Sequence, residues 1–395
     1  MSSRRATAAA LGAAAFALSA TAALPAAARD SSSGPESSTA TTSTADAAAG
    51  PIPGRWRGSI VLFDQSMTTQ TVGVGGDYQS ENPTYEWWVA FKPRYALLDR
   101  PTHSVTLNLW MNAYLELTSS DTTTRRRELL LGPTYLWGSY GHSLRDRGGY
   151  RTWASVGPRV TIPTDRGARA TGQLMAVGAV GALSQTFPLL GGGARALTGG
   201  RVGIGVIYGH PVNRWTSPQT DDVHELREDI NGTSVISHQL RGQMNVRHSL
   251  NVSLQGDLQI SKRLALSLSY VFINSWRYPP PVAVLTTLPT GPAVAMSNAD
   301  PTTYGVNTWL MGTLGYDVVD DMTVSIGYYN LTNQLAPDGT RRDPLWSPAA
   351  RVFLTLTANL DAVYERIARA RRAGARAAAS SPSTEAMAKP NQMSP

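Results

Sequence analysis

The sequence predicts an all-β fold, a transmembrane, antiparallel, up-and-down β-barrel of about twelve strands. Two observations predict it, and a third limits the chemistry that the chain can carry. Polar and apolar side chains alternate along stretches of about 12–16 residues, whereas strands of water-soluble proteins usually have about 5–6. No stretch of the expected folded region reaches eighteen consecutive apolar residues, so a membrane-spanning helix is not expected there. The chain has no cysteine, which excludes disulfides, thiolate metal sites and a cysteine nucleophile.

Twelve segments carry the alternation, and its regularity varies along the chain. It is cleanest in 104–117 and 264–276, it is weakest in 67–75, and glycine and alanine blur it in 127–139 and 171–186. In chain order, the predicted strands are 67–75, 83–95, 104–117, 127–139, 150–162, 171–186, 201–210, 247–260, 264–276, 304–317, 322–331 and 350–364.

The two ends of the chain have a different composition. Two arginines precede a mostly apolar run and then small residues at the cleavage spacing, so residues 1–28 are expected to be a secretory signal peptide. Residues 29–54 are rich in Ser, Thr and Ala and lack bulky apolar side chains, so a disordered linker is expected. The barrel is assigned to residues 55–366, and residues 367–395 are assigned to a basic, low-complexity periplasmic tail.

The two faces of the predicted strands require different surroundings. In 247–260, one face carries Ser249, Asn251, Ser253, Gln255 and Asp257, and the other carries Leu250, Val252, Leu254, Leu258 and Ile260. A water-filled lumen accommodates so polar a face, whereas a dry core does not. Aromatic residues sit at strand ends, as in the girdles of membrane barrels: Tyr270, Phe272, Trp276, Tyr316 and Tyr364. The apolar face is therefore predicted to contact lipid.

Connection lengths favour the same interpretation in the C-terminal half. Turns at 261–262 and 318–321 are short, and the loops on the opposite side are long: 211–242, 277–303 and 332–349. Outer-membrane barrels have short periplasmic turns and longer extracellular loops. The N-terminal half lacks this contrast, and the 187–199 connection is long for a turn.

Over residues 55–364 the chain resembles a bacterial outer-membrane β-barrel of the general porin-like class, by pattern and not by a signature motif. The resemblance implies a location in the outer membrane and contact with membrane lipid. Such barrels often end at an aromatic residue of the last strand. Here the strand could end at Tyr364, but about thirty residues follow. Within them, residues 361–379 fit a short basic helix and a bare tail equally well.

Charged residues on the predicted inner face are the candidate site. An arginine on the lipid side would cost about 2–4 kcal/mol at the midplane, so these residues are expected to point inward. The predicted pore-lining residues are Lys92, Arg94, Glu116, Arg151, Arg159, Arg201, Arg247, Asp257, Arg351 and Asp361. Together with Glu86 and Asp317 on the same faces, they show an excess of bases that favours anions. Ion pairs that only fill the lumen fit the pattern equally well.

The predicted function is an outer-membrane channel or transporter that passes small solutes by diffusion through a polar lumen, with anionic solutes favoured where the excess of bases acts on them. No cofactor or metal is expected. A nucleic-acid partner is not expected either, since the basic residues are scattered. The solute and the oligomeric state are left open. The loops 211–242 and 277–303 are long enough to fold inward as a lid.

Two alternatives remain: a barrel enzyme that hydrolyses lipid or peptide, and a non-conducting structural barrel. Enzymatic activity is not expected, because the His-Ser pairs at 103–104, 142–143 and 248–249 are adjacent and would point to opposite faces of a strand. The acidic stretch 220–229 is expected to be a solvated outer loop.

Overall fold

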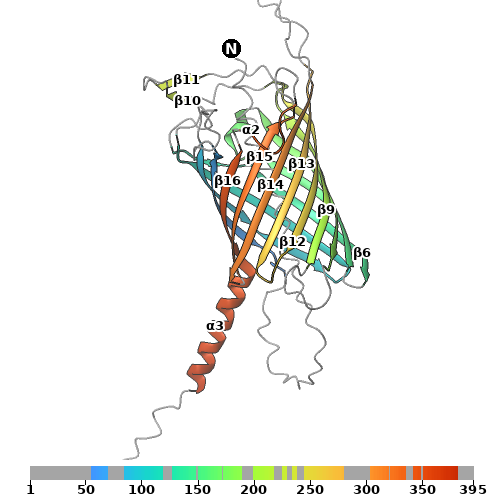
Figure 1. Ribbon diagram of the computed structural model, residues 1–395, viewed down its shortest axis with the longest axis vertical. Helices are drawn as coiled ribbons and strands as arrows, with labels where there is room; N and C mark the ends of the chain where they lie inside the picture. Colours follow the sequence, from blue (N-terminus) through green and yellow to red (C-terminus); the bar gives the residue numbers. More distant parts are fainter. Residues whose placement is uncertain are drawn as a thin grey trace, which may run out of the picture.

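The chain folds into a closed antiparallel β-barrel with a long helix at one end (Figure 1). The computed structural model describes residues 55–69, 84–118, 127–147, 150–170, 172–188, 199–217, 225–228, 234–237, 244–279, 303–319, 321–334, 341–347 and 350–380. The expected signal peptide and linker therefore lie outside the described residues.

Twelve strands close the ring, as the sequence predicts. β3 (Arg94–Asp99) continues β2 after Pro93, and β5 (Leu129–Leu131) is a short addition to β4. The twelve are β1 (Ile60–Thr68), β2 (Tyr85–Lys92), β4 (His103–Glu116), β6 (Thr134–Arg147), β7 (Tyr150–Ile162), β8 (Gln173–Phe187), β9 (Gly199–Asn213), β12 (Val246–Gln259), β13 (Leu264–Arg277), β14 (Tyr304–Val319), β15 (Met322–Asn333) and β16 (Arg351–Asn359).

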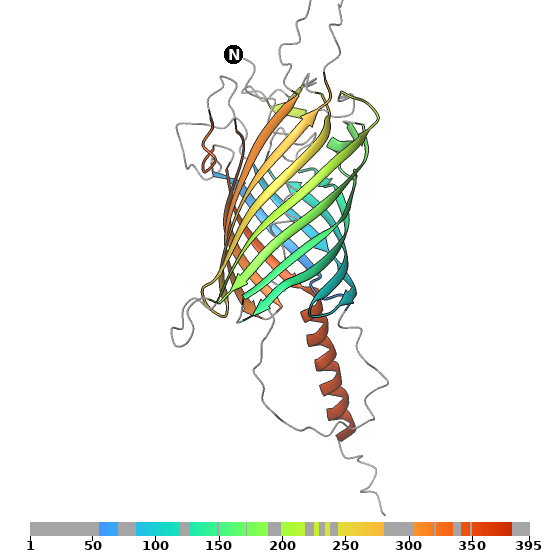
Figure 2. The ribbon, with the colours of Figure 1, turned by 90° about the vertical axis from the view of Figure 1, so that its right-hand side faces the viewer.

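Each barrel strand pairs with its neighbours in the chain, and the first strand pairs with the last. β1 and β16 are antiparallel, with Ile60 opposite Asn359 and Thr68 opposite Arg351. Closure leaves no strand of the ring with an unpaired edge, which is the condition for placing a sheet in hydrocarbon. The strands cross the barrel at a marked tilt (Figure 2).

Three short elements complete the described structure: α2 (Arg166–Ala170), β10 (Glu225–Glu228) and β11 (Ser234–Ser237). They lie at the end of the barrel opposite α3 (Leu360–Ser380), as Figure 1 shows. We call these the loop end and the helix end. No helix in the described ranges is long and apolar enough to cross a membrane.

The two ends differ in their connections. At the helix end, most connections are short: 100–102, 148–149, 260–263 and 320–321. At the loop end they are longer: 69–84, 117–133, 163–172, 214–245, 278–303 and 334–350. The contrast thus holds in both halves of the chain, although the 188–198 connection at the helix end remains long. The predicted lid loops lie mostly outside the described residues.

Three predicted strands have different bounds in the structure. The first strand is displaced: β1 runs from Ile60 to Thr68, and the apolar run at its start hides the alternation because both faces are apolar at that level. Residues 70–75 of the predicted segment 67–75 lie outside the described residues. The segment 127–139 is displaced, since β6 continues to Arg147. The last strand stops at Asn359, and α3 follows with Asp361 in its first turn. A negative charge there interacts favourably with the positive end of the helix dipole. Tyr364 is therefore helical and not part of a girdle.

Lipid-facing and inward-facing residues alternate as predicted. On β2, the odd-numbered Trp87, Val89 and Phe91 are 40%, 45% and 39% exposed, whereas Trp88 and Ala90 are 8% and 0% exposed. Large exposed apolar side chains recur on one face of every long strand, for example Leu254 on β12 and Leu268 on β13. The buried face is the inner face of the barrel.

Candidate functional site: the inner face of the barrel

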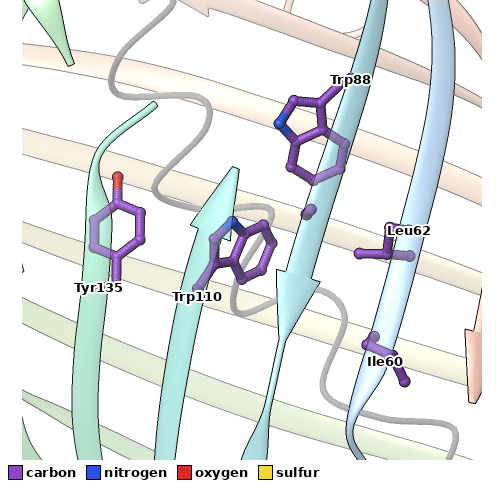
Figure 3. Close-up of a cluster of buried hydrophobic side chains, with 6 residues drawn as sticks. Ile60, Leu62, Trp88, Trp110 and Tyr135 are labelled. Carbon is purple, nitrogen blue, oxygen red and sulfur yellow. The ribbon is translucent and has the colours of Figure 1, made fainter. Parts of the chain in front are cut away.

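One wall of the interior is apolar and aromatic. Neighbouring strands β1, β2, β4 and β6 contribute a buried cluster, and Figure 3 shows its larger members side by side. The cluster consists of Ile60, Leu62, Trp88, Ala90, Trp110 and Tyr135. The rings of Trp88 and Trp110 lie 5.8 Å apart, between centroids. Part of the inner face is therefore apolar, whereas the sequence predicts a polar lumen.

A second apolar cluster extends this wall around the ring. Val271, Ile273 and Trp309 are buried on β13 and β14, and Tyr329 packs against them. Tyr329 in turn lies 5.9 Å from Phe353 of β16, between ring centroids. The aromatic wall, as we call it, thus runs over the inner faces of β13–β16, β1, β2, β4 and β6.

Among the described residues, no hydrogen-bond acceptor lies within reach of the indole nitrogens of Trp110 and Trp309 in the aromatic wall. Nε1 of Trp110 and Nε1 of Trp309 are both buried and unpaired. An indole N–H that lacks an acceptor can donate a hydrogen bond to a polar group of a bound molecule.

The opposite wall carries small side chains. One row of directly paired residues crosses four adjacent strands, β7, β8, β9 and β12. The row consists of Ser155, Ala182, Gly205 and Ser253. A Cβ atom added at Gly205 would lie 2.5 Å from Oγ of Ser253, so only glycine fits beside that serine without movement. The interior therefore carries its large rings on one side and small side chains on the other.

Two buried basic side chains lie over rings of the aromatic wall. Nζ of Lys92 is 4.0 Å from the ring centroid of Trp110, and Cζ of Arg159 is 4.4 Å from that of Tyr135. Both distances fall within the range of cation–π contacts. Arg159 forms no ion pair with a carboxylate in the described part of the chain. Positive charge is thus held against an apolar surface.

Two ion pairs join charged residues of the inner face. Arg351 of β16 donates to Glu86 of β2, and Oγ of Ser66 on the intervening β1 donates to the same carboxylate at 3.3 Å. Arg201 of β9 pairs with Asp257 of β12 at 2.7 Å and is partly exposed. The predicted site residues Arg201 and Asp257 are therefore brought together, while Arg351 meets Glu86.

The remaining predicted site residues are spread over the barrel. Arg151 lies over Trp153 and donates to the carbonyl oxygen of Pro101 at 2.7 Å, at the helix end. Glu116 is buried and accepts from the backbone N–H of Thr118 at 2.7 Å, at the loop end. Arg94 is half-buried in β3.

Two members of the predicted set lie at the ends of the barrel. Arg247 is exposed beside a register irregularity at the start of β12. Asp361 belongs to the first turn of α3, because the last strand ends before it.

The sequence interpretation missed two features of this face. Asp64 of β1 is buried and accepts from Oγ1 of Thr355 at 2.6 Å, but the first strand had been placed too late to include it. The aromatic wall was missed because its rings occur singly in strands that read as polar on that face. Only pairing between strands brings Trp88, Trp110 and Tyr135 together.

The described histidines do not form a hydrolytic pair. His103, His142, His210 and His248 hydrogen-bond with one another, with tyrosine hydroxyls or with a backbone carbonyl. Within the described ranges no histidine hydrogen-bonds to a serine. Most of the acidic stretch 220–229 lies outside the described residues.

A closed barrel with a lipid-facing apolar surface, exposed tyrosines near both rims and short turns at one end is an outer-membrane β-barrel. Its place is the outer membrane, in contact with lipid.

Comparisons with known proteins give matches among solved structures alone. No protein-family profile and no curated protein matches the sequence. An outer membrane channel from Pseudomonas putida F1 is similar with a TM-score of 0.43 and 10% identity, over 80% of this chain and 99% of that one. The NanC porin has a TM-score of 0.33 and 9% identity, over 76% and 98% of the two chains. Outer membrane phospholipase A from Escherichia coli has a TM-score of 0.33 and 10% identity, over 76% and 89%.

Proposed function

We propose that this barrel is a diffusion channel for small solutes that combine an anionic group with an apolar body, such as aromatic carboxylates. The observation that carries the proposal is the stacking of Arg159 and Lys92 on rings of the aromatic wall. A carboxylate can pair with such a cation while the rest of the solute lies against apolar side chains. The proposed pore lining comprises the inward members of the predicted set, without Arg247 and Asp361.

The small-residue wall supports passage on the side opposite the rings. Twelve strands give an interior between the side-chain-filled barrels of about eight strands and the wide pores of 16–18. A narrow path is therefore expected along β8, β9 and β12, because their inner faces carry glycine, alanine and serine. A hydrolase remains the weaker candidate, because no described histidine hydrogen-bonds to a serine.

The anion preference can be tested by removing one charge at two places. Arg159→Gln should lower the anion-to-cation permeability ratio about two- to five-fold, equivalent to roughly 0.4–1 kcal/mol of lost attraction. Arg201→Gln removes the same charge at a position away from the aromatic wall. There the charge of Arg201 is already paired with Asp257. Reversal potentials in a salt gradient measure the permeability ratio. Comparing benzoate with acetate as the anion shows how much the apolar part of the solute adds to its permeability. A cation-selective wild type, or equal ratios for benzoate and acetate, would contradict the proposal.

The position of the path can be tested by narrowing it. Ala182→Phe places a ring on the small-residue wall and should lower single-channel conductance several-fold. Ala179→Phe, on the same strand, adds the same ring beside the exposed Tyr208 on the lipid face and should leave conductance unchanged. Recording in planar bilayers distinguishes the two. If Ala182→Phe conducts like the wild type, the path does not follow this wall.

A further inference from the structure

The tripeptide Tyr-Gly-His occurs twice, at 140–142 in β6 and at 208–210 in β9. In both places the neighbouring strand supplies a second histidine. His103 of β4 is the direct pairing partner of His142, and His248 of β12 lies beside His210. We call Tyr140, His103 and His142 the helix-end cluster. The loop-end cluster is Tyr208, His210 and His248.

The two clusters have the same geometry. In the helix-end cluster, the two Nδ1 atoms are 3.2 Å apart, and the hydroxyl of Tyr140 is 2.9 Å from Nδ1 of His103. In the loop-end cluster, the corresponding distances are 3.3 Å between Nδ1 atoms and 2.8 Å from Tyr208 to His248. Recurrence of this arrangement on separate strand pairs indicates that it does not depend on one local irregularity.

Both clusters are on the outer surface of the barrel near its rims. Tyr140 and Tyr208 are 45% and 40% exposed, and the histidines are half-exposed. His103 begins β4 at the helix end, whereas His210 lies near the last residue of β9 at the loop end. At these levels the side chains meet the water-containing headgroup region and not the centre of the hydrocarbon.

The separation of the nitrogens matches a shared metal ion. A tetrahedral ion with Zn–N bonds of about 2.0–2.1 Å holds two nitrogens about 3.3 Å apart. The imidazole rings are inclined by only 25° in one cluster and 34° in the other, so their Nδ1 edges lie next to each other. A neutral imidazole nitrogen is a common metal ligand, so two Nδ1 atoms at this separation suit a divalent cation.

We propose that each cluster is a surface site for a late first-row divalent cation, Zn²⁺ or Cu²⁺, with two imidazole Nδ1 ligands. The tyrosine oxygen and water are available for the other positions. Within the described ranges no group of three or more His, Cys, Asp or Glu could hold a metal, so each site has only two strong ligands. An affinity in the micromolar range is therefore expected. Cu²⁺ should bind more tightly than Zn²⁺, as it does at most nitrogen and oxygen sites.

Binding at the helix-end cluster requires one rearrangement. Nδ1 of His142 lies 3.0 Å from the carbonyl oxygen of Thr102, which can only accept a hydrogen bond. That nitrogen therefore carries the hydrogen in the metal-free protein. When an ion binds, the hydrogen moves to Nε2 of the same ring by exchange with water, the ring stays neutral, and no net proton is released.

The test uses the full chain without a histidine tag, refolded in detergent, with Zn²⁺ titrated calorimetrically and Cu²⁺ followed by electron paramagnetic resonance. Two ions per barrel are expected, each Cu²⁺ with two coupled nitrogens. His142→Gln and His210→Gln should each remove one ion. Leu144→Gln adds the same amide on the lipid side of β6 but retains both imidazole pairs, so it should still bind two.

Further outcomes decide the location of the ions. Pulsed electron paramagnetic resonance should give a Cu–Cu separation of about 25 Å or more. The reason is that the two aromatic girdles of a membrane barrel flank an apolar band of about that height. Absence of binding at millimolar ion, or an unchanged stoichiometry in His142→Gln/His210→Gln, would overturn the proposal. Circular dichroism and unchanged conductance of the variants show that the barrel itself is intact.

Discussion

Arg351→Met is expected to destabilise the barrel by about 3–5 kcal/mol, because it leaves the carboxylate of Glu86 buried without its cation. The side chains of Arg351 and Glu86 are 17% and 7% exposed, so water cannot replace the lost partner well. Methionine keeps much of the volume, which limits the contribution from a cavity.

The free energy of unfolding in phospholipid vesicles, followed by tryptophan fluorescence against urea, measures this loss. Arg201→Met is the matched control, since its pair with Asp257 is more exposed, and about 1 kcal/mol or less is expected there. The double variant Glu86→Gln/Arg351→Met should recover most of the stability, because neither partner of the pair is then left as an uncompensated charge. Equal losses for Arg351→Met and Arg201→Met would show that burial does not distinguish the pairs.

Leu254→Arg is expected to cost about 2–4 kcal/mol of folding free energy in a bilayer. Leu254 is 50% exposed on the lipid-facing side of β12, near the middle of the strand, between Ile204 and Tyr270 of the neighbouring strands. A guanidinium there must lie in hydrocarbon or distort the bilayer to reach water.

Gln255→Arg is the control for this prediction, because the next residue of the strand points inward. The same charge should then change stability by less than about 1 kcal/mol. Folding yield in vesicles and the urea midpoint provide the measurement. In detergent micelles the two variants should differ less, because micelles deform more easily than a bilayer. A larger loss for Gln255→Arg than for Leu254→Arg would reverse the assignment of the two faces.

Much of the fold could be predicted where alternation is strict. β4, β12 and β13 carry long alternating runs, so their faces and approximate bounds followed from a period of two residues. The prediction failed at β1, where Ile60–Phe63 is apolar on both faces. It also overran the last strand into α3, because "DAVYERIARA" contains helix formers whose apolar positions are compatible with either period over a few residues.

The candidate site could be predicted only as a set of inward charges. Which of them meet depends on strand order and register: Glu86 is 265 positions from Arg351 in the chain but is separated from it by one strand, β1, in the barrel. The same holds for the aromatic wall, which no local pattern reveals.

The sequence by itself determined a membrane barrel of long strands, with leucine-rich faces toward lipid, because side-chain period and strand length are local properties of the chain. Only the tertiary structure decided which side chains share the interior: the rings on one wall, the glycines and serines on the other, the Arg351–Glu86 pair, and two histidine pairs at the rims. These contacts arise from the register of neighbouring strands and from ring closure, which are non-local and leave no periodic trace in the sequence.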